Sequence, residues 1–340
     1  MNTTHLAIDL AKSVFEVAVS RQPGRVHEQH RLSRRGLERF VAQHHPAEIL
    51  LEACGTAHHW GRTFHAMGHQ VRLLPPSAVR RYRAGNKTDR ADTKALLEAA
   101  RNTAIAPVPV KSLDQQAITA LHRLRAGYLH ARTARINALR GHLREFGVTI
   151  PTGPVHVVPR ARAALDTGAV PPYLRVALEE VVDEILALRQ QADAVQQILT
   201  QVAGHLPAAQ LLMTVPGIGV LTATALVAFV GDIHRFRTGR HFAAYLGLTP
   251  REYSTGHVRR LGSMTKRGNS YLRMLLIHGA RAALRAGRVA QTPDDLRTWA
   301  LAVQHRHGHN VAAVALANKL ARVAWRVWRD HRPFEVRRAM

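Results

Sequence analysis

The chain has 340 residues, enough for two or three domains of roughly 100–200 residues each. Its 48 lysines and arginines against 23 acidic residues give a formal net charge of +25, which predicts a polyanionic partner, most simply nucleic acid. The single cysteine, Cys54, excludes a disulfide framework or a cysteine zinc site within one chain, and we expect it to be a small buried residue. No run approaches the ~20 apolar residues of a membrane span, and the N-terminus lacks a signal-peptide pattern. We therefore expect a soluble, cytoplasmic, nucleoid-associated bacterial protein.

The first hundred residues alternate between strand and helix patterns. The apolar runs predict strands at 5–10, 14–20 and 25–33, a helix at 34–44, a strand at 48–53, a helix at 58–68, a strand at 70–75 and a helix beginning near Asp89. Three strands followed by this alternation are the order of a ribonuclease-H-like α/β domain. In that topology the first strand, the fourth strand and a late helix meet at one edge of the sheet.

The middle of the chain is predicted to be helical. Apolar residues recur with helical spacing over 113–145, where the polar face is mostly arginine and histidine. Residues 147–174 are rich in proline and glycine and predict a loop with a short helix, and residues 175–204 resume a helical pattern with many acids. A basic helix followed by an acidic one indicates an antiparallel pair or a helix-mediated dimer. Two ordinary packed helices explain the pattern equally well.

The C-terminal third begins with a helix, the tight turn PGIG and an apolar helix, which resembles a helix-hairpin-helix element. In such hairpins the backbone N–H groups at Gly217 and Gly219 can hold a phosphate, although a plain helix–helix turn would use the same residues. Residues 294–330 predict helix that completes a core. We interpret the tract HRHGHN within them as a solvated loop and not as a metal site.

Four carboxylates stand where a nuclease-type metal site would need them. Asp9 ends the run HLAID and Glu52 ends the run EILLE, and a charge amid apolar residues is costly without a partner. Asp89 and Asp92 lie three residues apart at a helix start, so both project from one face. Hard oxygen ligands of this kind suit Mg²⁺. The alternatives are an N-cap at Asp89, a helix-dipole role for Asp92 and a surface acid at Glu52.

A basic segment, 250–273, carries small residues among its cations. Ser254, Thr255 and Gly256 form a short step in which a serine hydroxyl could attack phosphorus if a base or a metal removed its proton. The alternative is that these residues form a turn or donate to a phosphate. We expect phosphate contacts from the neighbouring cations, which are Arg251, Arg259, Arg260, Lys266, Arg267 and Arg273.

Several motifs together resemble one family over nearly the whole chain. They are AIDLAK, LLEACGT and KTDRADTKAL in the first part and VPGIGVLTATAL, YLGLTPREYSTG and RLGSMTKRGNSYLRMLLIHGAR in the last part. The chain is similar to transposases of the insertion-sequence "one-ten" family, which are DEDD-type enzymes related to Piv-type DNA invertases. The resemblance implies a RuvC-like first domain. The family often has Ser-Ser-Gly-Gly where this chain has Ser254-Thr255-Gly256-His257.

The resemblance implies roles that residue spacing does not. It makes Asp9, Glu52, Asp89 and Asp92 the Mg²⁺ ligands, and it makes Ser254 the nucleophile that forms a covalent phosphoserine link to DNA. The implied partners are donor DNA, target DNA and a structured bridge RNA encoded by the element. The implied assembly is a homo-oligomer, a dimer or tetramer, in which the acids of one subunit meet the serine of another.

The expected fold class is α/β plus all-α. We expect a RuvC-like DEDD domain at 1–108, a coiled-coil-like helical hairpin at 109–205 and a C-terminal transposase domain with the helix-hairpin-helix-like element at 206–335. The function this predicts is that of a site-specific DNA recombinase of a mobile element. Two alternatives remain. One is a RuvC-like Holliday-junction endonuclease without a covalent intermediate, and the other is a non-catalytic nucleic-acid-binding protein.

Overall fold

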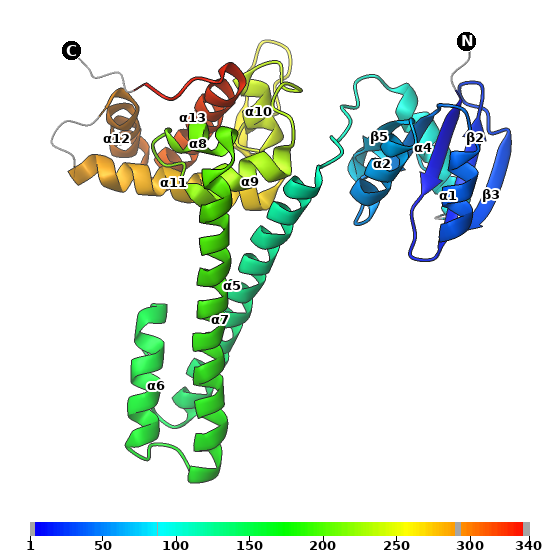
Figure 1. The fold of residues 1–340 in the computed structure, drawn as a ribbon. Helices are drawn as coiled ribbons and strands as arrows, with labels where there is room; N and C mark the ends of the chain where they lie inside the picture. The colour runs from blue at the N-terminus through cyan, green and yellow to red at the C-terminus, as the bar shows by residue number, and fades with distance from the viewer. Residues whose placement is uncertain (1–3, 87, 290–293, 336–340) are drawn as a thin grey trace. The chain divides into compact units, whose positions relative to one another are not determined.

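The computed structural model describes residues 4–86, 88–289 and 294–335, and it divides into two compact units, Met1–Asp114 and Gln115–Met340 (Figure 1). The first unit combines a sheet with helices, and the second is mainly helical. The predicted boundary at residue 108 falls just before this division, whereas the predicted division of the second unit at residue 205 stays a prediction. Among the described residues, no helix has both the length and the apolar character needed to cross a membrane.

The first unit is built on a mixed five-stranded sheet in the order β3-β2-β1-β4-β5. Its strands are β1 (His5–Asp9), β2 (Val14–Ser20), β3 (Glu28–Ser33), β4 (Glu48–Glu52) and β5 (Gln70–Leu74). Strands β1, β2 and β3 pair antiparallel, while β4 runs parallel to both β1 and β5. This arrangement agrees with the predicted ribonuclease-H-like order.

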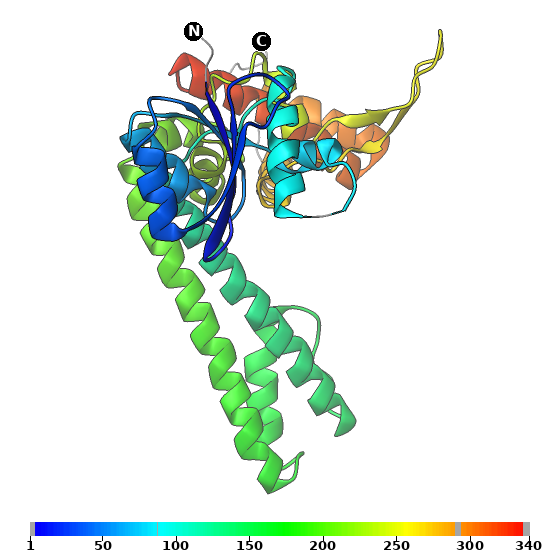
Figure 2. The same cartoon turned by 90° about the vertical axis from the view of Figure 1, so that its right-hand side faces the viewer.

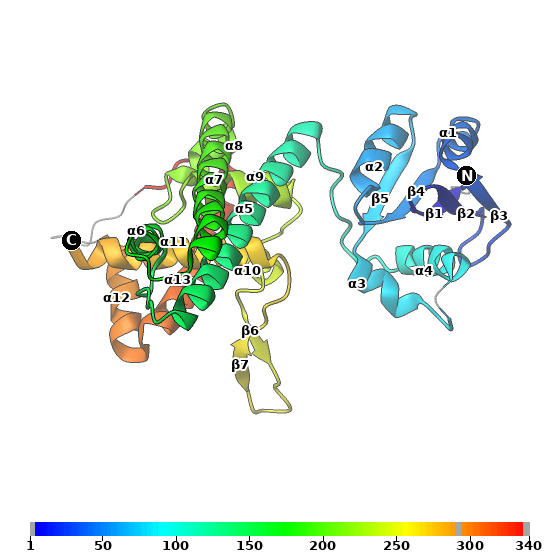
Figure 3. The ribbon, with the colours of Figure 1, turned by 90° about the horizontal axis from the view of Figure 1, so that it is seen from below.

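Helices cover both faces of this sheet, because alternate residues of a strand point to opposite sides. Leu6, Ile8 and Leu51 pack with the helices on one face, and Ala7 and Leu50 pack under a helix on the other. The first face carries α1 (Arg34–Ala42) and α2 (Ala57–Ala66), and the second carries α3 (Pro76–Val79), a 3₁₀ turn (Arg80–Tyr82) and α4 (Asp89–Arg101) (Figure 3). The strand runs are therefore almost wholly apolar, as two-sided burial requires.

Two long antiparallel helices, α5 (Leu113–Glu145) and α7 (Pro172–Gly204), run side by side in the second unit (Figures 1 and 2). Arg125 donates to Gln196 at 2.7 Å, and Arg135 contacts Glu184 at 2.5 Å, so the basic helix lies against the acidic one as predicted. The short helix α6 (Val157–Asp166) packs against the C-terminal part of α5 and the N-terminal part of α7. It lies in the segment where a short helix was predicted. The charge pattern is thus explained within one chain, and a helix-mediated dimer stays a prediction.

The remaining helices share one large apolar core. They are α8 (Pro207–Met213), α9 (Val220–Val230), α10 (Gly239–Tyr245), α11 (Ser270–Val289), α12 (Asp295–His307) and α13 (His309–Asp330). The predicted helical stretch 294–330 is broken at Gly308, whose φ of +83° ends α12. The sequence did not predict the hairpin of β6 (Pro250–Glu252) and β7 (Leu261–Met264), which projects from the helical body in Figures 2 and 3.

A buried histidine connects three helices of this core. His122 of α5 is fully buried, and its two ring nitrogens lie 3.0 Å from Tyr271 Oη on α11 and 3.0 Å from Thr224 Oγ1 on α9. Thr224 already donates its hydroxyl proton to the Val220 carbonyl at 2.7 Å. His122 Nε2 must therefore donate to Thr224, and Nδ1 must accept from Tyr271. Burial and the nearby Arg125 lower the pKa of His122 from 6.5 to about 4, so the ring is neutral in the folded protein.

This pKa shift predicts loss of stability in acid. The unfolded chain binds a proton at His122 below about pH 6.5, whereas the folded chain does so only below about 4. The neutral ring therefore makes its full contribution to the free energy of unfolding above pH 6.5. About 3 kcal/mol of that contribution is lost as the pH falls from 6.5 towards 4. We expect the difference in unfolding free energy between the wild type and His122→Gln, measured by denaturant titration, to shrink by that amount from pH 7 to pH 4. Parallel pH profiles of the two proteins would contradict this.

Candidate functional site

Three carboxylates share one face and one end of the sheet in the first unit. Asp9 and Glu52 end the parallel neighbours β1 and β4, where Ile8 pairs with Leu51 one residue earlier. Asp9 and Glu52 follow Ala7 and Leu50 by two residues along their strands. They therefore lie on the same face of the sheet, the one that α4 covers. Glu16 of β2 pairs directly with Asp9, shares this side and is only 7% exposed. Sequence reasoning missed Glu16, although a lone acid within the run VFEVAVS was a usable signal.

The start of α4 brings further charges to this end of the sheet. Thr88 is the N-cap and accepts from the Ala91 amide at 3.2 Å, so the alternative of Asp89 as N-cap is wrong. Asp89 itself is exposed in the first turn. Asp92 is mostly buried and lies 3.2 Å from Arg83, and Arg90 lies 3.5 Å from Glu16. Helix α4 therefore supplies two acids and Arg90, while Arg83 comes from the segment just after the 3₁₀ turn.

These acids define a candidate metal centre by their side of the sheet and by their chemistry. Within 4–86, 88–289 and 294–335, no three acidic, histidine or cysteine side chains lie close enough together to hold an ion as placed. The chemistry of the donor set nevertheless suits Mg²⁺, because the carboxylates are hard oxygen ligands carried at one end of the sheet by adjacent parallel strands and a helix start. The cation contacts of Asp92 and Glu16 are the interactions that an ion would have to displace or share. The metal role of Asp9, Glu52, Asp89 and Asp92 stays a prediction.

The second candidate element is the β6–β7 hairpin that carries Ser254. The Ser254 hydroxyl donates to the Glu252 carboxylate at 2.7 Å and accepts from the Arg260 amide at 3.2 Å. Arg259 also contacts Glu252, at 3.3 Å. The hydrogen bond from Ser254, with the charge of Arg259, holds the pKa of Glu252 below its usual range. The serine oxygen is thus oriented by an ionised carboxylate, which sequence reasoning did not identify.

A tight turn exposes this serine. Thr255 and Val258 exchange both backbone hydrogen bonds, at 3.1 and 3.0 Å, around Gly256 and His257. Gly256 has a φ of +54°, which suits the first central position of a two-residue hairpin. The departure from the Ser-Ser-Gly-Gly pattern therefore keeps a glycine where the turn needs one. The short step predicted at 254–256 is thus part of a hydrogen-bonded hairpin end, and Ser254 is exposed on it.

The predicted phosphate-binding cations divide into two groups. Five of them are exposed along the hairpin and the loop after it, where they could meet phosphates: Arg251, Arg259, Arg260, Lys266 and Arg267. Arg273 is different, because its Nη1 donates to the Leu246 and Arg267 carbonyls at 3.2 and 3.0 Å. These bonds brace the loop against the end of α10. A phosphate contact from any of these cations stays a prediction.

The glycines of the PGIG turn have different surroundings. Gly217 has a φ of +88°, and a Cβ there would lie 2.7 Å from the Gly279 carbonyl oxygen on α11. Gly219 has open space around its Cβ position. Close packing of the turn on α11 is therefore a sufficient reason for a glycine at position 217. No such contact requires a glycine at position 219, and the space beside it could admit a ligand. A phosphate-binding role for either glycine stays a prediction.

This contrast predicts the effects of two matched substitutions. Gly217→Ala should destabilise the second unit by at least about 2 kcal/mol, because it combines a positive φ with a backbone clash. Gly219→Ala should leave stability within about 0.5 kcal/mol. Thermal unfolding of both variants measures this. Equal midpoints would show that packing on α11 is not what requires Gly217.

Cys54, expected to be buried, is exposed in the loop between β4 and α2. The His-rich tract 305–310 spans the end of α12 and the start of α13, so it is mainly helical and not the loop that was predicted.

Known protein families match the two parts of the chain that contain the candidate elements. A family model described as "Transposase", of the DEDD type, matches residues 6–148, and the model "Transposase IS116/IS110/IS902 family" matches residues 209–294. The chain is 41% identical to a probable family 20 transposase of Pseudomonas aeruginosa, with 96% of each chain covered. It is 38% identical to the transposase for insertion sequence element IS1111A of Coxiella burnetii, covering 94% of this chain and 88% of the relative.

A more distant relative is the pilin gene-inverting protein of Moraxella bovis, 24% identical with 99% of each chain covered. These matches define the class as a DEDD-type transposase, an enzyme that cleaves and joins DNA strands. The chain belongs to the IS110 family of insertion-sequence transposases, as the sequence predicted.

Proposed function

We propose that this transposase cuts and rejoins DNA through covalent attack by Ser254 on a scissile phosphate. The observation that supports this most strongly is the exposed Ser254 hydroxyl, held between the Glu252 carboxylate and the Arg260 amide on a projecting hairpin. In the first step the serine oxygen bonds to phosphorus, and the displaced strand leaves with a free hydroxyl. In the second step a strand hydroxyl attacks the phosphoserine, rejoins the DNA and restores Ser254.

Glu252 orients the nucleophile in this proposal. A carboxylate that accepts from Ser254 fixes the direction of the serine lone pairs, and its lowered pKa keeps it ionised at neutral pH. The same low pKa makes Glu252 a weak final acceptor for the serine proton. Arg259 contacts Glu252, and Arg260 lies next to it in the chain, with its amide bound to Ser254. In this proposal their positive charges stabilise the negative charge that builds up on the phosphate oxygens in the transition state.

The four acids of the first unit complete the proposed site. Asp9, Glu52, Asp89 and Asp92 would hold Mg²⁺, and Glu16 would join them through its pairing with Asp9. A bound Mg²⁺ would polarise the phosphate and neutralise charge on the attacking and leaving oxygens. The family resemblance supports assembly into a dimer or tetramer in which acids and serine come from different copies. It also supports a bridge RNA that pairs with donor and target DNA.

Trapping on DNA tests the nucleophile. Incubated with a nicked substrate that prevents rejoining, the wild type should form a protein–DNA adduct resolved by denaturing electrophoresis. Ser254→Ala should form none, because the attacking oxygen is gone, while the matched variant Thr255→Ala should retain it. An adduct with Ser254→Ala would contradict the assignment. Cleavage without any adduct in the wild type would favour the junction endonuclease instead.

The role of Glu252 predicts a slower first step. Glu252→Gln keeps the size of the side chain but removes the charge that orients Ser254, so the rate of adduct formation should fall by roughly 10-fold to 100-fold. The matched control is Glu145→Gln, an exposed acid at the end of α5. Equal rates in both variants would remove Glu252 from the proposal. A fall caused by unfolding is excluded if DNA binding and thermal midpoint are unchanged.

A further inference from the structure

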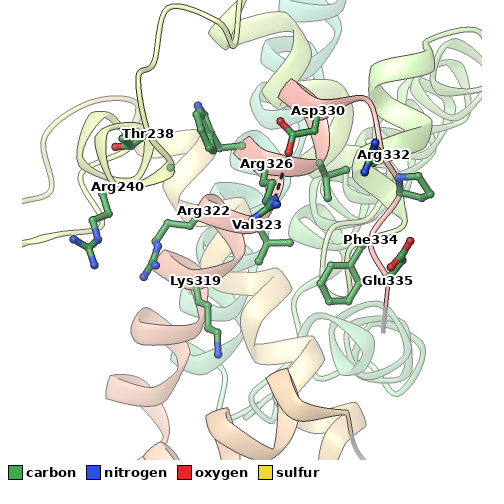
Figure 4. Close-up of a pocket in the computed structure, with 14 residues that line it drawn as sticks. Thr238, Arg240, Lys319, Arg322, Val323, Arg326, Asp330, Arg332, Phe334 and Glu335 are labelled. Atoms are coloured by element: carbon green, nitrogen blue, oxygen red, sulfur yellow. Dashed lines mark ion pairs between the residues drawn. The ribbon is translucent and has the colours of Figure 1, made fainter. Parts of the chain in front are cut away.

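A large cationic cavity lies on the C-terminal body, lined by α10, α13 and the segment that follows α13 (Figure 4). Its volume is about 1090 Å³, and its basic lining residues are Arg240, Lys319, Arg322, Arg326 and Arg332. Among the described residues, two acids, Asp330 and Glu335, line it with them. None of these cations belongs to the basic segment around Ser254. The cavity therefore carries an excess of positive charge that the proposed chemistry does not use.

Close helix packing holds these cations together. A Cβ at Gly239 would lie 3.1 Å from both the Cα and the carbonyl oxygen of Arg322, so glycine allows α10 to begin directly against α13. This contact sets Arg240 beside Arg322, and both side chains extend in the same general direction as Lys319 in Figure 4. Lys319, Arg322 and Arg326 follow one another on successive turns of α13, about 4.5 and 6 Å apart along its axis.

The charges in the cavity are only weakly compensated. Arg326 contacts Asp330 at 3.3 Å, but its side chain is 81% exposed, so this pair contributes little. Burial and the neighbouring Arg322 lower the pKa of Lys319, which lies 4.2 Å from the Trp299 ring centroid. Sites for small molecules are mostly apolar with a few polar groups. Exposed guanidinium groups in a row fit phosphate oxygens better, since their planar forks bind them in pairs.

A second cavity lies between this site and the hairpin of Ser254. Lys319 and Arg322 line both cavities, and the second is also lined by Pro250 of β6 and by Gly262–Met264, most of β7. Its volume is about 930 Å³. Two of the cations of α13 therefore face both the first cavity and a second one that reaches the base of the hairpin carrying the proposed nucleophile.

We propose that this cavity binds the phosphate backbone of the DNA strand next to the scissile phosphate, as an anchoring site separate from the hairpin. DNA is the occupant because the adjoining cavity, which shares Lys319 and Arg322, reaches the base of the Ser254 hairpin, whose proposed substrate is DNA; this choice rests on the proposed function. Lys319, Arg322 and Arg326 contact successive phosphates of one strand, and Arg240 contacts the strand from α10. The site positions the substrate and takes no part in bond breaking.

The test is the salt dependence of DNA binding by the double variant Arg322→Gln/Arg326→Gln in the full chain. Fluorescence anisotropy with a labelled duplex DNA would be measured from about 50 to about 200 mM salt, where phosphate contacts change affinity steeply. The slope of log affinity against log salt should become shallower by about 1.8, at about 0.9 for each phosphate that the variant no longer neutralises. The matched control, Arg285→Gln/Arg306→Gln, removes the same charge from exposed positions outside the cavity and should keep most of the slope.

The outcomes separate this inference from the proposed function. An unchanged slope in the double variant, or an equal decrease in the control, overturns the inference, and so does a decrease seen only with an RNA of the same length. An adduct at Ser254 in the wild type alongside such a result leaves the proposed function intact. A shallower slope in the double variant alone supports the inference even if no adduct forms with the wild type.

Discussion

The register of the five-stranded sheet in the first unit is the constraint on which the candidate metal centre depends. Parallel pairing of β1 with β4 and antiparallel pairing of β1 with β2 fix Asp9, Glu52 and Glu16 on the same side. Cations already contact two of the acids at this end, because Arg90 lies beside Glu16 and Arg83 lies beside Asp92. In the proposed mechanism a divalent ion would be held among these carboxylates, which would connect the fold to phosphate chemistry.

In the proposed mechanism the second unit has a different role, which is to present the Ser254 hydroxyl to DNA. A large helical core supports a short hairpin on which Ser254 is exposed yet oriented by Glu252 and the Arg260 amide. The loop after the hairpin is fastened by glycine contacts, since a Cβ at Gly247 or Gly268 would overlap backbone atoms. The closely packed loop supports the base of the hairpin, and Ser254 is exposed near its end. The proposed nucleophilic role needs both features.

Hydrophobic periodicity predicted the regular elements well, because an element that buries one face or both has apolar residues at regular spacing in the sequence. The strands that end at Asp9 and Glu52 and the long helix 113–145 agree with the structure. Contacts between residues on different elements produce no such regular spacing, so they could not be predicted in this way. The link from Glu252 to Ser254, the pairing of Glu16 with Asp9 and the capping of α4 by Thr88 depend on register and turn geometry. The hairpin was missed because its strands are only three and four residues long and are mostly exposed, so they carry no apolar alternation.

In the proposed mechanism, the acids of the first unit and Ser254 of a neighbouring copy act on the same phosphate. The most direct measurement is the yield of the Ser254–DNA adduct formed by Asp9→Asn, compared with Glu98→Gln, a partly exposed acid further along α4. The account predicts that Asp9→Asn abolishes the adduct while the variant still folds and binds DNA, and that Glu98→Gln forms it as the wild type does. Adduct formation by Asp9→Asn at the wild-type rate would contradict the account.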